Sequence, residues 1–315
     1  HCWYDSKMDD WIVVGETLRA ANLGLNGYIR QTTPKLAAMD VFNFPVVSAC
    51  GTNTETSLPC MFSAIGRRDY DEARIRGSES LLHVLKRAGL NVLWRDNQSG
   101  CKGVCDGLPE ESIDPAMFPK LCADGRCYDE ALLAGMHKVI QDANGNLVVV
   151  LHMLGNHGPS YYKRYPAEFE LFVPACVTAE LHKCDRQSIV NAYDNAVLYT
   201  DHVLSHTIEL LKKLEPKYDT AMVFVSDHGE SLGEKGLYLH GLPQAIAPSE
   251  QTRVPMLWWL SEGFTSSFGL DRACLLDQTS KTLSHDNFFH SVLGMMGVKT
   301  KVYDRELDIT APCRK

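Results

Sequence analysis

The sequence predicts an α/β fold in which a mostly parallel central sheet carries helices on both faces. Short apolar runs at 147–151 and 221–225 have the composition of strands that are buried on both sides. Between them, residues 187–214 carry apolar side chains at helical spacing, which predicts a long amphipathic helix. Strands that alternate with helices form mostly parallel sheets. The sequence shows no internal repeat, low-complexity segment or linker, so we expect one domain over residues 1–315.

The other elements follow from the same patterns in chain order. Further strands are expected at 11–14, 41–47, 92–94 and 254–260, and further helices at 78–88, 129–142 and 286–296. Residues 96–128 and 160–186 have no clear periodicity, and the first of them is rich in Gly, Pro, Asp and Cys. We therefore predict loops in both stretches.

Composition argues against nucleic-acid binding and against a membrane-spanning helix within these residues. The formal net charge is −8 and the isoelectric point is about 5.8, without a basic stretch to offset the acidic balance, which argues against a nucleic-acid-binding protein. No window of 18 apolar residues occurs, so the sequence predicts no membrane-spanning helix. The 45% of hydrophobic residues are typical of a folded globular protein.

The 11 cysteines indicate an oxidising compartment, because most of them lie in close pairs within loop-like stretches. The expected disulfide partners are Cys50 and Cys60, Cys101 and Cys105, Cys122 and Cys127, Cys176 and Cys184, and the more distant Cys274 and Cys313. Cys2 is left over. Free thiols or a zinc-thiolate site are the alternatives, although no Cys-x-x-Cys motif is present.

Chemically reactive side chains follow several of the predicted strands. Glu16 comes just after the strand at 11–14, His157 follows the strand at 147–151, and Asp227 and His228 follow the strand at 221–225. Parallel α/β sheets bind ligands beyond the carboxyl ends of their strands. The sequence therefore predicts a site at this edge of the sheet, although each of these residues alone is also compatible with an ordinary turn.

The chemistry of these residues points to zinc. Glu16, Asp227 and His228 could supply three ligands, and the hydroxyl of Thr54 could take the fourth position. A zinc-bound hydroxyl loses its proton more easily, and a helix that begins at Thr54 would favour an attached phosphoryl group. The spacing leaves Thr52, Thr56 and Ser57 as rival nucleophiles, and Thr54 itself could be only a helix cap.

A second motif lies in the same region. Residues 229–233 satisfy the G-x-S-x-G pattern of a serine-hydrolase nucleophile elbow, with Ser231 as the serine. In an elbow the serine follows its strand almost at once and opens a helix. Here three residues intervene after the strand at 221–225, and the sequence that follows Gly233 is a poor helix start.

Taken together, the chain resembles the catalytic domain of the lipid A phosphoethanolamine transferases, which include the mobile colistin-resistance enzymes. The resemblance covers essentially the whole chain. It implies an alkaline phosphatase/sulfatase-like α/β/α sandwich with disulfide-stapled loops. The motifs that carry it are VVGET at 13–17, CGTNT at 50–54, PCMF at 59–62, WRDN at 94–97, GNHGP at 155–159, NAYDN at 191–195, SDHGESLGE at 226–234 and YLHG at 238–241.

The resemblance assigns roles to the strand-end residues. Thr54 would be the nucleophile, and Glu16, Asp227 and His228 would join it around one tightly bound Zn²⁺. Thr54 would take phosphoethanolamine from phosphatidylethanolamine and release diacylglycerol, and a lipid A phosphate would then accept the group. That modification weakens the binding of cationic polymyxins. A true sulfatase is disfavoured because the Cys/Ser-x-Pro-x-Arg context of formylglycine is absent.

The resemblance also implies more peripheral features. His157 and His240 would hold a second zinc or the phosphoryl oxygens, and Lys102 and His152 would contact substrate. A preceding membrane domain would place this chain, expected to be a monomer, at the periplasmic face of the bacterial inner membrane. The alternatives are a phosphodiesterase or phosphatase of the same superfamily, transfer to another glycolipid, and a non-catalytic periplasmic binding protein.

Overall fold

An eight-stranded sheet forms the centre of the computed structural model, which describes residues 7–215 and 217–315. The strand order is β12-β2-β11-β8-β1-β7-β3-β4. In chain order, the strands are β1 (Lys7–Gly15), β2 (Phe42–Ser48), β3 (Asn91–Asp96), β4 (Glu110–Ser112), β7 (Leu147–His152), β8 (Tyr218–Ser226), β11 (Arg253–Leu260) and β12 (Leu283–Ser284). Every strand predicted from the sequence is present.

The sheet is mostly parallel, as predicted. Along β1, Val13 lies opposite Leu151 of β7 and Phe224 of β8, and both pairings are parallel. The exception is β11, which is antiparallel to both β2 and β8. After β8 the chain makes no crossover and stays at the same edge through β9 (Ser231–Leu232), β10 (Tyr238–Leu239) and α7 (Ser249–Thr252). It must therefore re-enter the sheet in the opposite direction.

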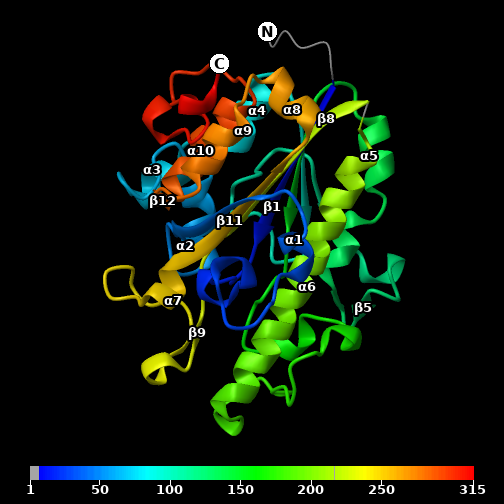
Figure 1. The fold of residues 1–315 in the computed structure, drawn as a ribbon, viewed down its shortest axis with the longest axis vertical. Coiled ribbons are helices and arrows are strands. Elements are labelled where there is room, and N and C mark those ends of the chain that lie inside the picture. Colours follow the sequence, from blue (N-terminus) through cyan, green and yellow to red (C-terminus); the bar gives the residue numbers. More distant parts are fainter. Residues whose placement is uncertain (1–6, 216) are drawn as a thin grey trace.

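Helices cover both faces of the sheet (Figure 1), and two hydrophobic cores result. Ile12 and Val14 of β1 belong to one core, and Val13 between them belongs to the other, as the two-residue period of a strand requires. On the first face lie α2 (Thr54–Met61), α4 (Leu81–Arg87) and α10 (Asp286–Met295). On the second lie α1 (Pro34–Ala37), α5 (Met136–Asp142) and α6 (Arg186–Lys212).

The helices differ from the predictions in two respects. The single helix expected at 129–142 is a 3-10 helix at Asp129–Leu133 followed by α5, because Gly135 between them has a left-handed φ of 70°. Short helices at α3 (Glu72–Arg76), α8 (Glu262–Ser267) and α9 (Arg272–Gln278) were not predicted, since each spans less than two full turns. Among the helices of the described ranges, none has the length and apolar character of a membrane span.

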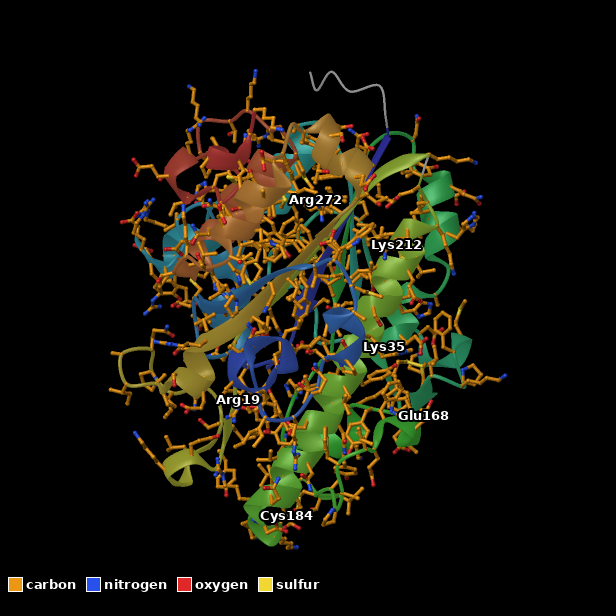
Figure 2. The ribbon with its side chains drawn as sticks, viewed as in Figure 1. Arg19, Lys35, Glu168, Cys184, Lys212 and Arg272 are labelled. Carbon is orange, nitrogen blue, oxygen red and sulfur yellow. A yellow bond between two sulfur atoms is a disulfide. The ribbon has the colours of Figure 1, made fainter. Side chains whose placement is uncertain are left out.

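The loop at 96–128 contains strand β4 and a small hairpin of β5 (Cys122–Ala123) and β6 (Arg126–Cys127). Cys184 lies just before the start of α6 (Figure 2). The structure joins ten cysteines in the expected partners: Cys50–Cys60, Cys101–Cys105, Cys122–Cys127, Cys176–Cys184 and Cys274–Cys313. Cys2 lies outside the described residues.

Candidate active site

Three of the predicted ligands meet where β1 and β8 end. Gly15 pairs with Ser226 in the sheet, so the next residues, Glu16 and Asp227, leave neighbouring strands side by side. The Nε2 atom of His228 lies 3.3 Å from Glu16 Oε1 and 3.6 Å from Asp227 Oδ2. All three side chains are fully buried.

Thr54 reaches this group from the segment after β2. In the sheet, β2 lies on the opposite side of β11 from β8. It is the first residue of α2, after the N-cap Asn53. Its Oγ1 atom donates a 2.8 Å hydrogen bond to Glu16 Oε2 and lies 3.4 Å from His228 Nε2. Two rival hydroxyls are committed elsewhere, because Thr52 donates to the Leu242 carbonyl and Ser57 donates to the Asp227 carbonyl. The geometry therefore favours Thr54 among the candidate nucleophiles.

The hydrogen bonds of His228 and Asp227 use one atom of each side chain and leave the other, Nε2 of His228 and Oδ2 of Asp227, facing the group of candidate ligands. His228 Nδ1 lies 2.8 Å from the Gly229 carbonyl, which can only accept, so the proton is on Nδ1 and Nε2 faces the carboxylates. Asp227 Oδ1 accepts from the backbone N–H groups of Thr17 and His228. Its Oδ2 is buried and has no hydrogen-bond partner.

The charges in this group are out of balance. Burial, followed by the negative charge of Glu16, raises the pKa of Asp227 to about 6. Burial also acts against ionisation of Glu16 and His228. The hydrogen bond and charge of His228 nevertheless lower the pKa of Glu16, and the two carboxylates raise that of His228 to about 10. Two buried acids thus share one histidine.

A divalent cation fits these residues. One donor atom each from Glu16, Asp227 and His228 lies within 4.8 Å of the others. The donors are two carboxylates and an imidazole nitrogen, which zinc accepts, and the free Asp227 Oδ2 would gain a partner. Buried charges need such compensation, because an unpaired charge is costly to remove from water.

The backbone around Glu16 is unusually constrained. Thr17 has a left-handed φ of 58°, rare for a β-branched residue, and its hydroxyl donates to Glu16 Oε1 at 2.6 Å. On the other side, a Cβ atom at Gly155 would lie only 2.6 Å from the Glu16 carbonyl oxygen. The loop that carries His157 can therefore pack directly against Glu16.

His157 and His240 lie beside the same group. The ring centroid of His240 is 4.3 Å from that of His228 and 6.3 Å from that of His157. Glu230 orients His240 through a 2.9 Å contact with Nδ1 and accepts a hydrogen bond from Tyr161. His157 Nδ1 is buried without a partner, and burial lowers the pKa of this side chain. Both histidines could bind a metal or a phosphoryl group.

The two predicted substrate contacts have different surroundings. Lys102 Nζ lies 3.7 Å from Glu55, which follows Thr54, and donates to the hydroxyl of Ser99. His152 has no exposed surface, and its Nδ1 lies 2.6 Å from Asp96 Oδ1. The structure therefore corrects the expectation that His152 touches substrate. The imidazole of His152 packs against Trp94 and holds the carboxylate of Asp96 in place.

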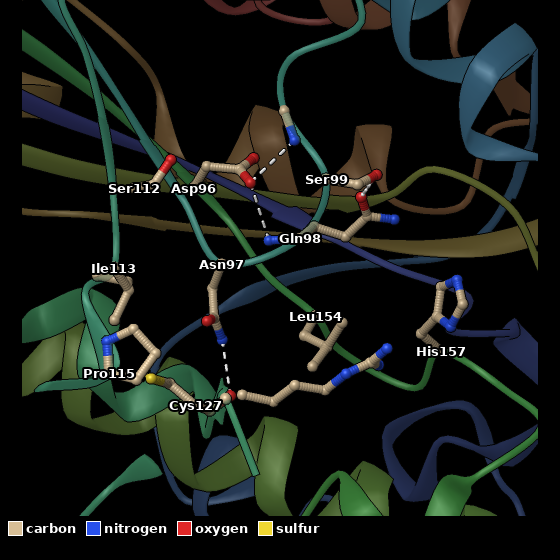
Figure 3. Close-up of a pocket in the computed structure, with 13 residues that line it drawn as sticks. Asp96, Asn97, Gln98, Ser99, Ser112, Ile113, Pro115, Cys127, Leu154 and His157 are labelled. Atoms are coloured by element: carbon tan, nitrogen blue, oxygen red, sulfur yellow. Dashed lines mark hydrogen bonds between the residues drawn. The ribbon is translucent and has the colours of Figure 1, made fainter. Parts of the chain in front are cut away.

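Sequence reasoning missed Gln98, which reaches the group through Asp96. Asp96 Oδ2 accepts from the backbone N–H groups of Gln98 and Gly100, and the amide of Gln98 then donates to Glu16 Oε2 at 3.0 Å. The rule that binding residues follow the carboxyl ends of parallel strands would have pointed to Gln98, if it had been applied to the strand at 92–94 as well. Figure 3 shows Gln98 and His157 in the lining of an adjacent cavity of about 510 Å³.

The serine-elbow alternative is excluded by the surroundings of Ser231. This residue begins the short strand β9 and is fully buried, instead of opening a helix. Its Oγ accepts a 2.9 Å hydrogen bond from the Gln251 amide. Glu230 and Gly233 belong to the loop that shapes the site.

Comparison with known proteins agrees with this geometry. The model of the sulfatase family matches residues 10–298. The chain belongs to the sulfatase family. The solved soluble domain of lipooligosaccharide phosphoethanolamine transferase A from Neisseria meningitidis is 44% identical. Its TM-score is 0.94, with 100% of this chain and 96% of that chain covered.

Within the sulfatase family, the named relatives are phosphoethanolamine transferases. Phosphoethanolamine transferase EptA of Escherichia coli K12 is 47% identical over 305 residues, which cover 96% of this chain. Phosphatidylethanolamine transferase Mcr-1 of Escherichia coli is 42% identical over 304 residues, which cover 93% of this chain. The chain spans only 56% and 54% of these two relatives. The predicted family resemblance and fold class are confirmed.

Proposed function

We propose that this chain is a zinc-dependent transferase that moves phosphoethanolamine from phosphatidylethanolamine to a phosphate of lipid A. The observation that carries the proposal is the position of Thr54. Its hydroxyl lies at the start of α2 and contacts both Glu16 and His228. The names of the relatives support the transferred group, and the hydroxyl supports a covalent phosphothreonine intermediate.

Zinc would be held by Glu16, Asp227, His228 and Thr54. When bound, it would lower the pKa of the threonine hydroxyl and attract the phosphoryl oxygens. His157 and His240 would bind either those oxygens or a second zinc. Lys102 and Gln98 come from one loop and lie beside Glu55 and Glu16 respectively, and they would contact the transferred group.

The reaction would have two displacement steps. In the first, Thr54 Oγ1 forms a bond to phosphorus, and the bond from phosphorus to the glycerol oxygen breaks. The hydroxyl proton, which points toward Glu16 Oε2 in the structure, leaves Thr54, and the departing diacylglycerol oxygen gains a proton. In the second, an oxygen of the lipid A phosphate forms a bond to phosphorus, the bond from phosphorus to Thr54 Oγ1 breaks, and Thr54 regains a proton. Helix N–H groups stabilise the phosphorylated threonine between the steps.

We also propose that the reaction takes place at the periplasmic face of the inner membrane and gives resistance to polymyxins such as colistin. Disulfides in the loops support an oxidising compartment. Lipid A modified in this way carries less net negative charge and binds cationic peptides less well.

The intermediate provides the direct test. Intact-mass measurement after incubation with a phosphatidylethanolamine analogue should show one phosphoethanolamine adduct, which is absent in Thr54→Ala. Thr56→Ala is the matched control, because only its backbone N–H is used in the cap of α2. An adduct that persists in Thr54→Ala would overturn the nucleophile assignment.

Release of the adduct separates the transferase from a phosphodiesterase or phosphatase that uses the same residues. The adduct should be discharged by lipid A much faster than by water. Equal rates with and without lipid A would favour the hydrolase. Another glycolipid that discharges the adduct faster than lipid A would correct the acceptor.

A further inference from the structure

Arg164 is a buried arginine with no counter-ion among the described residues. Only 5% of its surface is exposed, and its Nε donates a 2.8 Å hydrogen bond to the carbonyl of His157. Its Nη1 is buried and has no hydrogen-bond partner. Across residues 7–215 and 217–315, no carboxylate lies within ion-pair distance of this guanidinium. A buried charge in this state is costly unless a ligand supplies the missing partner.

The nearest charges do not supply that partner. The negative charge of Asp129 acts on Arg164 only at longer range. Its carboxylate oxygens accept hydrogen bonds from Asn97 and from the backbone N–H groups of Leu154 and Gly155 instead. Burial, followed by the positive charge of Arg126, lowers the pKa of Arg164 to about 10. Two guanidinium groups therefore lie near one another with no acid paired to either in the described residues.

Arg126 also connects two cavities. It lines a cavity of about 420 Å³ with Lys163 and Arg164, where Asp124 is the only acid in the described lining. It lines the cavity of Figure 3 as well, together with Gln98 and His157 of the candidate active site. A ligand that contacts Arg126 can therefore extend toward Gln98 and His157 of the candidate active site.

The backbone that carries Arg126 is held in place. The Cys122–Cys127 disulfide closes the β5–β6 hairpin, and the Cys127 carbonyl accepts a 3.0 Å hydrogen bond from Asn97. Asn97 lies between Asp96 and Gln98 in the loop that reaches Glu16. The backbone at Arg126 is thus fixed relative to the active site, and its side chain is exposed.

We infer that Arg126 and Arg164 form a binding subsite for a phosphate monoester, which receives the second, non-reacting phosphate of the acceptor lipid. This inference rests on the proposed function, because lipid A carries a phosphate at each end of its disaccharide. While one phosphate attacks the phosphothreonine, the other requires cationic partners. Arg126 suits this role because an exposed guanidinium can bind phosphate through two parallel hydrogen bonds, and Arg164 adds a second positive charge beside it.

The test removes the charge of Arg126 and, separately, the second phosphate of the acceptor. In Arg126→Gln, we expect kcat/KM for bisphosphorylated lipid A to fall about tenfold, as for loss of one charge-assisted hydrogen bond. With monophosphorylated lipid A, wild type and variant should react alike. Lys301→Gln removes an exposed positive charge elsewhere and should leave both acceptors unaffected.

Two outcomes would overturn the inference. One is an equal effect of Arg126→Gln, or none, on the two acceptors. The other is slower formation of the Thr54 adduct from the phosphatidylethanolamine analogue alone, which would assign the subsite to the donor phosphate. Inorganic phosphate should compete with bisphosphorylated lipid A in the wild type more strongly than in Arg126→Gln. If the wild type forms no adduct, the proposed function fails instead, so the two failures are distinguishable.

Discussion

Two buried histidine–carboxylate clusters lie at the same edge of the sheet. Glu16, Asp227 and His228 follow β1 and β8, and Asp96 and His152 end β3 and β7. Both clusters contain a fully buried histidine and acids that are almost without exposed surface. From the sequence they look alike, since each is a short apolar run followed by an acid or a histidine.

The clusters differ in how their charges and hydrogen bonds are satisfied. Asp96 faces one histidine and also accepts from the indole of Trp94 and from the N–H groups of Gln98 and Gly100. In the other cluster two acids face one histidine. Each cluster also has one buried atom without a hydrogen-bond partner, which is His152 Nε2 in the first and Asp227 Oδ2 in the second, and only the latter belongs to a carboxylate. The comparison teaches that two acids facing one histidine, with a free carboxylate oxygen, distinguish the candidate metal site, whereas a histidine beside an aspartate does not.

The largest expected effect comes from removing a charge in the unbalanced cluster. Glu16→Gln should weaken zinc binding by more than about 100-fold, the upper end of the loss when only an outer partner of a ligand is changed. It should also abolish the Thr54 adduct. Zinc content by elemental analysis and intact mass are the measurements. Glu55→Gln is the matched control, because Glu55 is exposed and adjacent to Thr54. Full zinc occupancy in Glu16→Gln would remove Glu16 from the ligand set.

The balanced cluster should respond in stability instead. Asp96→Asn leaves His152 without its acid and should lower the free energy of unfolding by about 3 kcal/mol, the lower end for breaking a buried pair. Urea unfolding measures this loss, and zinc content should remain that of the wild type. A variant that loses zinc but keeps its stability would show that the two clusters are not distinct in role.

Sequence patterns located the unbalanced cluster because its members directly follow strands. The alternating helices and strands predicted the parallel sheet, and a parallel sheet brings the ends of distant strands together. Thr54 needed the family resemblance, since its spacing alone left Thr52, Thr56 and Ser57 open.

Other features depend on contacts that no local pattern contains. The antiparallel direction of β11 follows from the edge at which the chain leaves β8. Arg164 has an ordinary loop sequence around it, and only the fold shows that it is buried without an acid paired to it in the described part of the chain. His152 is the last residue of β7 and not the first residue after it, and its contact with Asp96 of β3 makes it a structural residue.

His285 is another residue that the sequence did not reveal, and it should make stability depend on pH. Its Nδ1 accepts from the N–H of Cys50, and its Nε2 donates to the Ser226 carbonyl, so it ties the loop before Thr54 to the end of β8. Burial lowers the pKa of His285 to about 4. Because the unfolded chain binds this proton more readily, the stabilisation is complete above about pH 6.5 and declines as the pH falls toward 4.

The full decline for His285 is on the order of 3 kcal/mol. Urea unfolding of the wild type and of His285→Gln between pH 7 and pH 4 measures it. The glutamine amide can also accept at one atom and donate at another, without titrating. The variant should therefore lose less stability on acidification, and parallel curves for the two proteins would contradict the prediction.

The smallest effect is expected in a third histidine–carboxylate cluster, which lies outside the site. His202 and His206 of α6 lie 3.5 and 3.1 Å from Glu130, and the three side chains are 22 to 35% exposed. Lys35 Nζ lies 2.7 Å from His202, so a cation already balances the single acid, and water screens the pairs. Glu130→Gln should therefore change the free energy of unfolding by less than about 1 kcal/mol. It should leave zinc content and the Thr54 adduct unchanged. A loss of zinc as large as that in Glu16→Gln would show that charge deficit and burial do not distinguish metal-binding clusters in this fold.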